Sequence, residues 1–314
     1  MPITLDDASL SPSSLTMTPI LRRILHGAGS VLALIGIVFV GLRLHTYLLD
    51  LDLSRITLLV WSFIAMFSLI YSSANFLLAL AWWHLLRYLG CSPTRLGTIR
   101  VYGISQLAKY VPGNIFHLAG RQALGMAEGI SAGILVKSTI WELGLIASAG
   151  TLSIWLILPL LLPNLFPDFP EIKGVLLMLV NTALLVGFLY RTFDRQPTLS
   201  FIWQIFFLLL SGAIFVALLE LIADTKGLGA QHWLMIGGAY IAAWLVGLVT
   251  PGAPAGVGVR EMILLFLLKD IVVDRDLLIA ILLGRLVTVV GDLIFFFVTY
   301  SIPARFCALK KSDV

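Results

Sequence analysis

Long apolar runs separated by short polar segments dominate the pattern of this 314-residue chain. Each run has roughly the 20 apolar residues that a helix needs to cross about 30 Å of hydrocarbon. The pattern predicts an all-α polytopic membrane protein with about seven or eight transmembrane helices. The predicted spans cover about residues 24–42, 57–83, 131–163 (as one long or tilted helix), 173–190, 200–223, 232–250 and 277–300.

Composition and charge support the same class. Hydrophobic residues make up 59% of the chain and charged residues 12%, whereas a soluble domain is about half apolar and about a quarter charged. The net charge of +4 does not indicate nucleic-acid binding, because the basic residues lie in short connections between apolar runs. There they set orientation and meet anionic lipid headgroups.

Two segments, 97–126 and 251–270, fit the helical pattern less well, and we expect them to be broken or re-entrant. Proline removes an amide donor from a helix, and glycine adopts the backbone angles needed to re-enter one. Helix breaks in corresponding places of two halves are typical of a transport site. The pattern is compatible with inverted repeats and equally with two merely similar motifs. The expected breaks are Pro112-Gly113 and Pro251-Gly252.

An arginine follows the proline by nine positions in both segments, as Arg121 and as Arg260. Helical spacing places Asn114, His117 and Arg121 on one face, and Lys109 approaches it from the preceding half. Guanidinium and ammonium groups bind phosphate, as do the free amides at the start of a half-helix. We therefore predict Lys109, Asn114, His117, Arg121 and Arg260 as headgroup-binding residues.

The alternative is that Arg121 and Arg260 pair with buried carboxylates and thereby fasten helices together. Glu142 is the best candidate for a counter-ion to a motif arginine, because its helix directly follows the first segment. Glu261 could pair with Arg260 or Arg121. Arg285 and Asp292 share a helix face and predict either a charge relay or, as we favour, a structural contact. The glycines at 252, 256 and 258 thin the backbone, so that a headgroup or another helix can approach closely.

Catalytic and cofactor motifs are not found. The five histidines are scattered, and no nucleotide-cradling glycine loop occurs. We expect no metal, no cofactor and no enzymatic activity.

The stretch SQLAKYVPGNIFHLAGR, residues 105–121, resembles the signature of the lysylphosphatidylglycerol synthase transmembrane (flippase-like) superfamily. TPGAPAGVGVRE, residues 250–261, is similar to its second signature, although Pro254 departs from a glycine-rich pattern. The resemblance implies lipid translocation. We expect a stand-alone member without the aminoacyltransferase domain of the bifunctional members.

The expected organisation is a polar tail over 1–20, a flippase-like transmembrane domain over 21–304 and a basic cytoplasmic tail over 305–314. Lysine and arginine placement puts both termini in the cytoplasm, and the resemblance implies the cytoplasmic (inner) membrane.

The function we expect is translocation of an anionic-headgroup lipid or a polyprenyl-phosphate-linked envelope precursor. One alternative is a membrane-embedded transferase acting on a lipid carrier, and another is an accessory subunit of envelope lipid or glycan synthesis. The expected partners are the lipid substrate, envelope-synthesis enzymes and further copies of the chain.

Overall fold

A computed structural model describes residues 57–111, 115–162, 171–222, 230–250 and 254–303, together with Val38, Leu42 and His45. Within these ranges the chain is helical and forms no β-strand. Two short 3-10 helices, η2 (Leu107–Tyr110) and η3 (Pro254–Gly256), accompany the α-helices. The α-helices are α2 (Leu58–Tyr88), α3 (Arg95–Gln106), α4 (Phe116–Ala127), α5 (Ala132–Thr151), α6 (Ile154–Leu161), α7 (Glu171–Thr192), α8 (Arg195–Ile222), α9 (Ala230–Val249), α10 (Val259–Leu268) and α11 (Asp274–Tyr300).

Six of the described helices, α2, α5, α7, α8, α9 and α11, are long and apolar enough to cross a membrane. Many of their large apolar side chains face outward, as expected where lipid rather than water is the solvent. The all-α polytopic membrane class is therefore confirmed, and the protein is an integral membrane protein. Except for Val38 and Leu42, the predicted span 24–42 lies outside the described residues, as do both predicted tails.

The prediction of one long helix over 131–163 is wrong. The structure divides this segment into α5 and α6 at Leu152–Ser153. The hydroxyls of Thr151 and Ser153 donate to the carbonyls of Ser148 and Gly150, at 2.8 and 2.7 Å. Such side-chain bonds to the preceding turn compete with the helical backbone pattern and bend helices. The proline-rich residues 163–170 are not among the residues that the structure describes.

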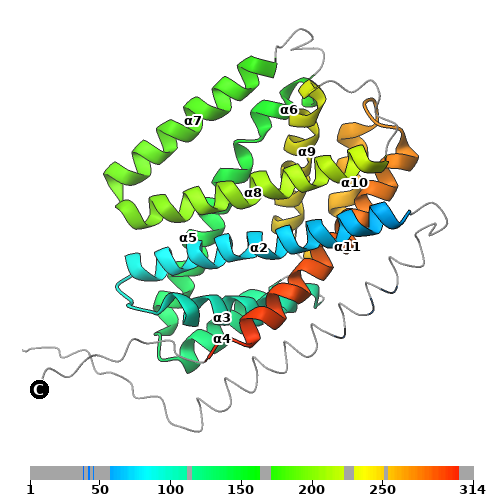
Figure 1. The fold of residues 1–314 in the computed structure, drawn as a ribbon. Helices are drawn as coiled ribbons and strands as arrows, with labels where there is room; N and C mark the ends of the chain where they lie inside the picture. The colour runs from blue at the N-terminus through cyan, green and yellow to red at the C-terminus, as the bar shows by residue number, and fades with distance from the viewer. Residues whose placement is uncertain are drawn as a thin grey trace, which may run out of the picture.

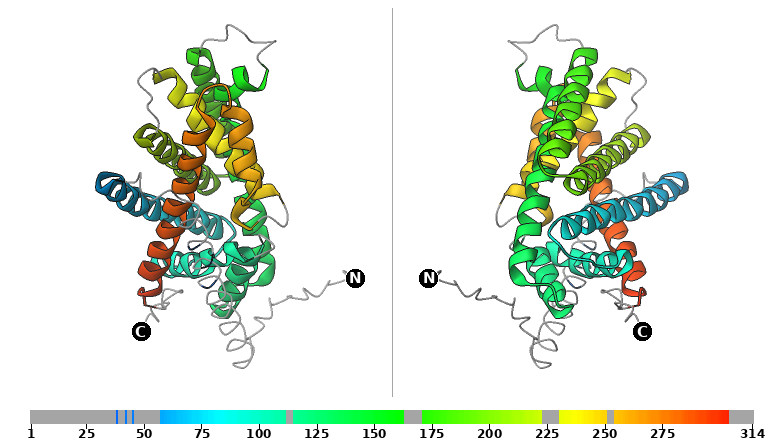
Figure 2. Two further views of the ribbon diagram at one scale, coloured as in Figure 1. Left: turned by 90° about the vertical axis from the view of Figure 1, so that its right-hand side faces the viewer. Right: turned by 90° about the vertical axis from the view of Figure 1, so that its left-hand side faces the viewer.

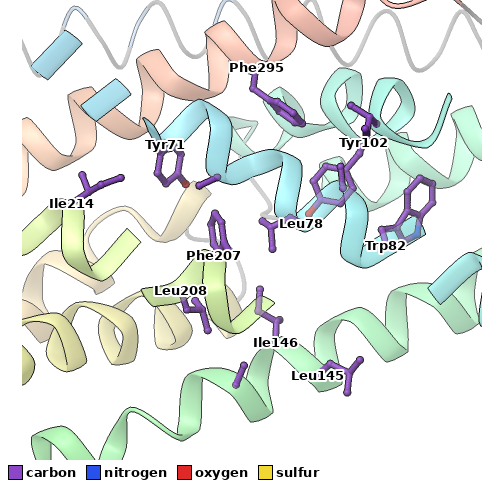
Figure 3. Close-up of a cluster of buried hydrophobic side chains, with 14 of the residues drawn as sticks. Tyr71, Leu78, Trp82, Tyr102, Leu145, Ile146, Phe207, Leu208, Ile214 and Phe295 are labelled. Carbon is purple, nitrogen blue, oxygen red and sulfur yellow. The ribbon is translucent and has the colours of Figure 1, made fainter. Parts of the chain in front are cut away.

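Helix α2 packs against both α8 and α11 (Figures 1 and 2). A Cβ at Gly291 would lie 2.9 Å from the backbone oxygen of Ser68, so the absence of a side chain lets α11 approach α2 closely. The buried cluster between these helices and α5 includes Tyr71, Leu78, Ile146, Phe207 and Phe295 (Figure 3).

Both predicted irregular segments contain a helix break. After η2 the chain turns extended at Val111, with φ −68° and ψ 134°, as expected for the residue before a proline. It resumes as α4 at Phe116. Likewise α9 ends at Val249, and α10 begins ten residues later at Val259 after the short η3.

Candidate functional site

One cavity lies where the two broken segments meet. Its empty volume is about 840 Å³, including space open to its surroundings. Helices α2, α3, α4, α5, α8, α9, α10 and α11 all contribute to its lining. The sequence did not show whether the two broken segments lie close together. In the structure, residues of both segments line this cavity. The charged residues and the histidine that line this cavity are Lys109, His117, Arg121, Glu142, Arg260 and Arg285.

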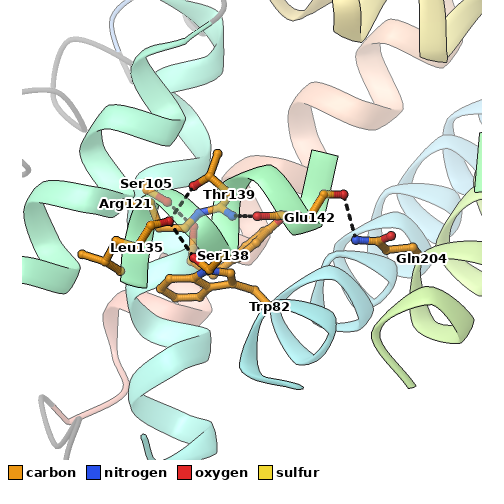
Figure 4. A network of polar contacts seen from close by, with 9 residues as sticks. Trp82, Ser105, Arg121, Leu135, Ser138, Thr139, Glu142 and Gln204 are labelled. Carbon is orange, nitrogen blue, oxygen red and sulfur yellow. Dashed lines mark hydrogen bonds and ion pairs between the residues drawn. The ribbon is translucent and has the colours of Figure 1, made fainter. Parts of the chain in front are cut away.

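Helix α4 positions the cations of the first segment. His117 and Arg121, one helical turn apart, both face the cavity and are 9% and 2% exposed. Arg121 forms an ion pair with Glu142 of α5 (Figure 4). This is the partner expected for Glu142. The Arg121 guanidinium carbon also lies 3.9 Å from the centre of the Tyr102 ring, and the Tyr102 hydroxyl donates to Glu142 at 3.0 Å.

Two further contacts hold this pair in place. The Glu142 backbone carbonyl accepts from the Gln204 amide of α8 at 3.3 Å. The Trp82 ring lies 5.3 Å from the Arg121 guanidinium, and its indole nitrogen donates to Ser138 at 3.0 Å (Figure 4). The guanidinium plane is therefore fixed by two aromatic rings and one carboxylate.

Lys109 pairs with Asp292 of α11, with 2.7 Å between Nζ and Oδ2. Asp292 is fully buried and also accepts from the Tyr110 hydroxyl at 2.6 Å and from the Asn75 amide at 3.2 Å. A buried carboxylate persists where a cation and neutral donors replace its water shell. Lys109 lines the cavity, whereas Asp292 is not among the lining residues.

Arg285 pairs with Glu261 of α10, with 2.6 Å between Nε and Oε1. It also donates to the backbone carbonyls of Ala255 and Gly256, at 2.9 and 3.0 Å. The expected pairing of Glu261 with Arg260 or Arg121 is therefore wrong. Arg285 and Asp292 do not contact each other, because seven residues along a helix separate the two by about 10 Å. Both are nevertheless held in ion pairs between elements, as the favoured structural interpretation expects. Each reaches a different neighbouring element instead.

Glu261 also accepts from the Gly258 backbone amide at 2.7 Å. The protein's own carboxylate therefore occupies part of the α10 N-terminus, where anions are favoured. We predicted that free amides at the start of this half-helix bind a substrate phosphate. The Gly258 amide is already bound to Glu261, so the prediction fails for that amide.

Arg260 differs from the other three cations. It is 7% exposed and lines the cavity, and its guanidinium carbon lies 4.1 Å from the centre of the Tyr240 ring. Among the described residues, no carboxylate or other hydrogen-bond acceptor contacts it. A buried cation without an anion is costly in a membrane, and such a residue is a functional candidate by default.

Two glycines place Arg260 at the cavity. Gly256 has a φ of +70°, and a Cβ there would lie 3.0 Å from the Gly247 Cα in α9. Side chains at these positions would separate η3 from α9 and move the start of α10. The prediction that Gly256 permits close approach of another helix is confirmed.

Unpartnered polar atoms also border the cavity. Within the described ranges, Nδ1 of His117 and Nε of Arg121 are buried and have no hydrogen-bond partner. Buried polar atoms are nearly always paired, so these two require an explanation, and a ligand in the cavity that both residues line would supply one.

The remaining predicted site residues, Asn114, Pro112, Gly113, Pro251 and Gly252, lie outside the described residues. Two side chains that matter here were not predicted from the sequence. Tyr102 stands 19 positions before Arg121, and Tyr240 stands 20 positions before Arg260. A search for aromatic residues 19 or 20 positions before each motif arginine would have found both.

Comparison of the chain with protein-family models and with curated proteins finds no match.

Proposed function

We propose that this protein translocates an amphiphile with an anionic headgroup across a membrane. The substrate is an anionic phospholipid or a polyprenyl-phosphate-linked envelope precursor. One observation carries the proposal: cations from both broken segments line a single cavity among apolar helices, and no carboxylate among the described residues pairs with Arg260.

Headgroup binding follows from the chemistry of these side chains. A phosphate oxygen and a guanidinium form a charge-assisted hydrogen bond that is roughly twice as strong as a neutral one. Arg260 supplies the charge. The unpartnered Nε–H of Arg121 is a further donor, and Nδ1 of His117 is another in the tautomer that carries its hydrogen there. The apolar tail stays in lipid while the headgroup occupies the cavity.

Movement follows from the helix breaks. Non-helical backbone at membrane depth is tolerated where it lines a cavity, and in transporters the two repeats rock around such a site. The energy comes from an ion gradient or from the lipid gradient itself.

The resemblance to the flippase-like superfamily supports the same function. We further propose that the protein lies in the cytoplasmic membrane with both termini in the cytoplasm. Its proposed partners are envelope-synthesis enzymes and further copies of the chain.

Translocation in liposomes that hold the purified protein tests the proposal. Fluorescent phosphatidylglycerol, phosphatidylcholine and polyprenyl phosphate are each placed in both leaflets, and dithionite then reports how fast the inner pool reaches the outer face. We expect faster movement of the anionic lipids, and loss of that movement in Arg121→Ala and Arg260→Ala. Arg275→Ala, which removes an exposed arginine at the start of α11, is the matched control and should move lipid normally.

The opposite result is equally clear. If folded protein moves no lipid, or if the motif variants move lipid as fast as the control, the transport proposal fails. A product formed from a lipid acceptor and an activated donor would then favour the transferase alternative.

A further inference from the structure

The cavity combines three ion pairs with one cation that has no counter-ion. Lys109 with Asp292, Arg121 with Glu142, and Arg285 with Glu261 are each neutral as pairs. Arg260 adds a single positive charge, so the described side chains around the cavity carry a net charge of +1. Residues 112–114 and 251–253, which are not among the described residues, contain no ionisable side chain.

From this charge balance we infer that the site selects a phosphodiester, which carries one negative charge, over a phosphomonoester or diphosphate. This inference rests on the proposed function and narrows its substrate class. A phosphodiester bound at Arg260 makes the cavity neutral. A phosphomonoester carries a charge of about −1.5 to −2 at pH 7 and leaves up to one charge uncompensated.

The three pairs cannot easily supply the missing positive charge. Taking a cation from its pair leaves a buried carboxylate alone, and such an uncompensated charge is strongly unfavourable. Geometry adds to this cost. Arg285 has three acceptors, Arg121 is held between two aromatic rings and a carboxylate, and the partner of Lys109 is fully buried.

The neutral donors favour the same ligand. His117 is buried beside Arg121 and has no carboxylate contact, so the imidazole is neutral there. Its unpartnered Nδ1 and Nε of Arg121 can add hydrogen bonds to phosphate oxygens without changing the charge balance.

Two kinds of lipid contain this headgroup chemistry. One is a glycerophospholipid with a second alcohol on its phosphate. The other is a polyprenyl phosphate whose phosphate already carries a sugar. The shared feature is a doubly esterified phosphate, and the length and branching of the tail distinguish the two sources.

Calorimetric titration of the purified full chain in detergent at pH 8 tests the inference. The phosphodiester probes are dioctanoyl phosphatidylglycerol and farnesyl phosphoglucose. Their phosphomonoester counterparts are dioctanoyl phosphatidic acid and farnesyl phosphate. We expect the diester to bind at least ten-fold tighter than the monoester of the same tail, and the tail with the higher affinity identifies the source.

Charge variants make the test specific. Arg260→Gln should weaken diester binding at least ten-fold, whereas Arg275→Gln, at an exposed site, should not. Glu142→Gln frees the charge of Arg121 and should bring the monoester to at least the affinity of the diester. Because the readout is a ratio within one variant, partial destabilisation cancels. If Glu142→Gln does not fold, Glu261→Gln frees the charge of Arg285 in the same way.

Three results overturn the inference. They are equal or tighter monoester binding by the unmodified chain, unchanged affinities in Arg260→Gln, and an unchanged ratio in the glutamate variants. If the protein translocates lipids without this headgroup preference, only the inference fails. If it neither binds nor translocates any probe, the proposed function fails with it.

Discussion

Neutralising one member of the pair between Lys109 and Asp292 should destabilise the protein as much as neutralising both. Lys109→Met leaves the fully buried Asp292 carboxylate with two neutral donors and no cation. Asp292→Asn leaves the ammonium of Lys109, which is 16% exposed, without an anion. Breaking a buried pair by removing one partner costs about 3–5 kcal/mol. Because Lys109 borders the cavity, we expect the lower end, about 3 kcal/mol, for each single variant.

The double variant contains neither charge. It loses one hydrogen bond between charged groups, and such bonds contribute about 1.5–3 kcal/mol. We therefore expect a loss of about 3 kcal/mol, against about 6 kcal/mol if the two effects were independent. The difference is a coupling free energy of about 3 kcal/mol. It measures the cost of the uncompensated charge that each single variant leaves behind.

Equilibrium unfolding in mixed detergent micelles, followed by tryptophan fluorescence, gives the four free energies of the cycle. Lys173→Met, at an exposed lysine near the start of α7, is the control and should neither change stability greatly nor couple to Asp292→Asn. A double variant that loses the sum of the two single losses would refute the assignment of this pair as a mutually compensated buried contact.

Three further substitutions test how the cavity is built. Gly256→Val should destabilise the protein by about 2–4 kcal/mol, because it adds strain at a positive φ to a clash with the Gly247 backbone; melting temperature measures this loss. Tyr240→Leu should weaken phosphodiester binding several-fold by removing a ring contact of about 0.5–2 kcal/mol from Arg260, while Tyr240→Phe keeps it; calorimetric affinity distinguishes the two. Gly103→Val would place its Cβ about 2.1 Å from a threonine hydroxyl of α11, so it should lower the melting temperature through overpacking.

Gly144→Ala is the matched control for the two glycine variants. Apart from its chain neighbours and the backbone of its own helix turn, a Cβ at Gly144 in α5 meets no described atom within 4 Å, and alanine favours a helix over glycine by about 1 kcal/mol. This variant should be as stable as the unmodified chain or slightly more so. If Gly256→Val or Gly103→Val behaves like it, the close helix contacts are wrong.

The spans were predictable from the sequence because crossing a membrane is a local property. A run of apolar residues long enough for the bilayer specifies a helix wherever it packs, and α2, α7, α8, α9 and α11 lie close to their predicted ranges. The helix breaks were predictable for a related reason, since proline acts on its own backbone and on the residue before it, as the extended Val111 shows. Three of the four cavity cations, Lys109, Arg121 and Arg260, also came from these local motifs, whereas Arg285 did not.

The charge partners were decided by the tertiary structure. Lys109 and Asp292 are 183 positions apart and meet only because α3 and its 3-10 extension pack against α11. Arg285 and Asp292 share a helix, yet they lie too far apart along it to touch, so each pairs with a residue from another element. Hydropathy and spacing describe one helix at a time, whereas pairing depends on which helices the small residues allow to approach. For the same reason, only the folded chain shows that Arg260, alone among the cations of this cavity in the described structure, is left without a carboxylate.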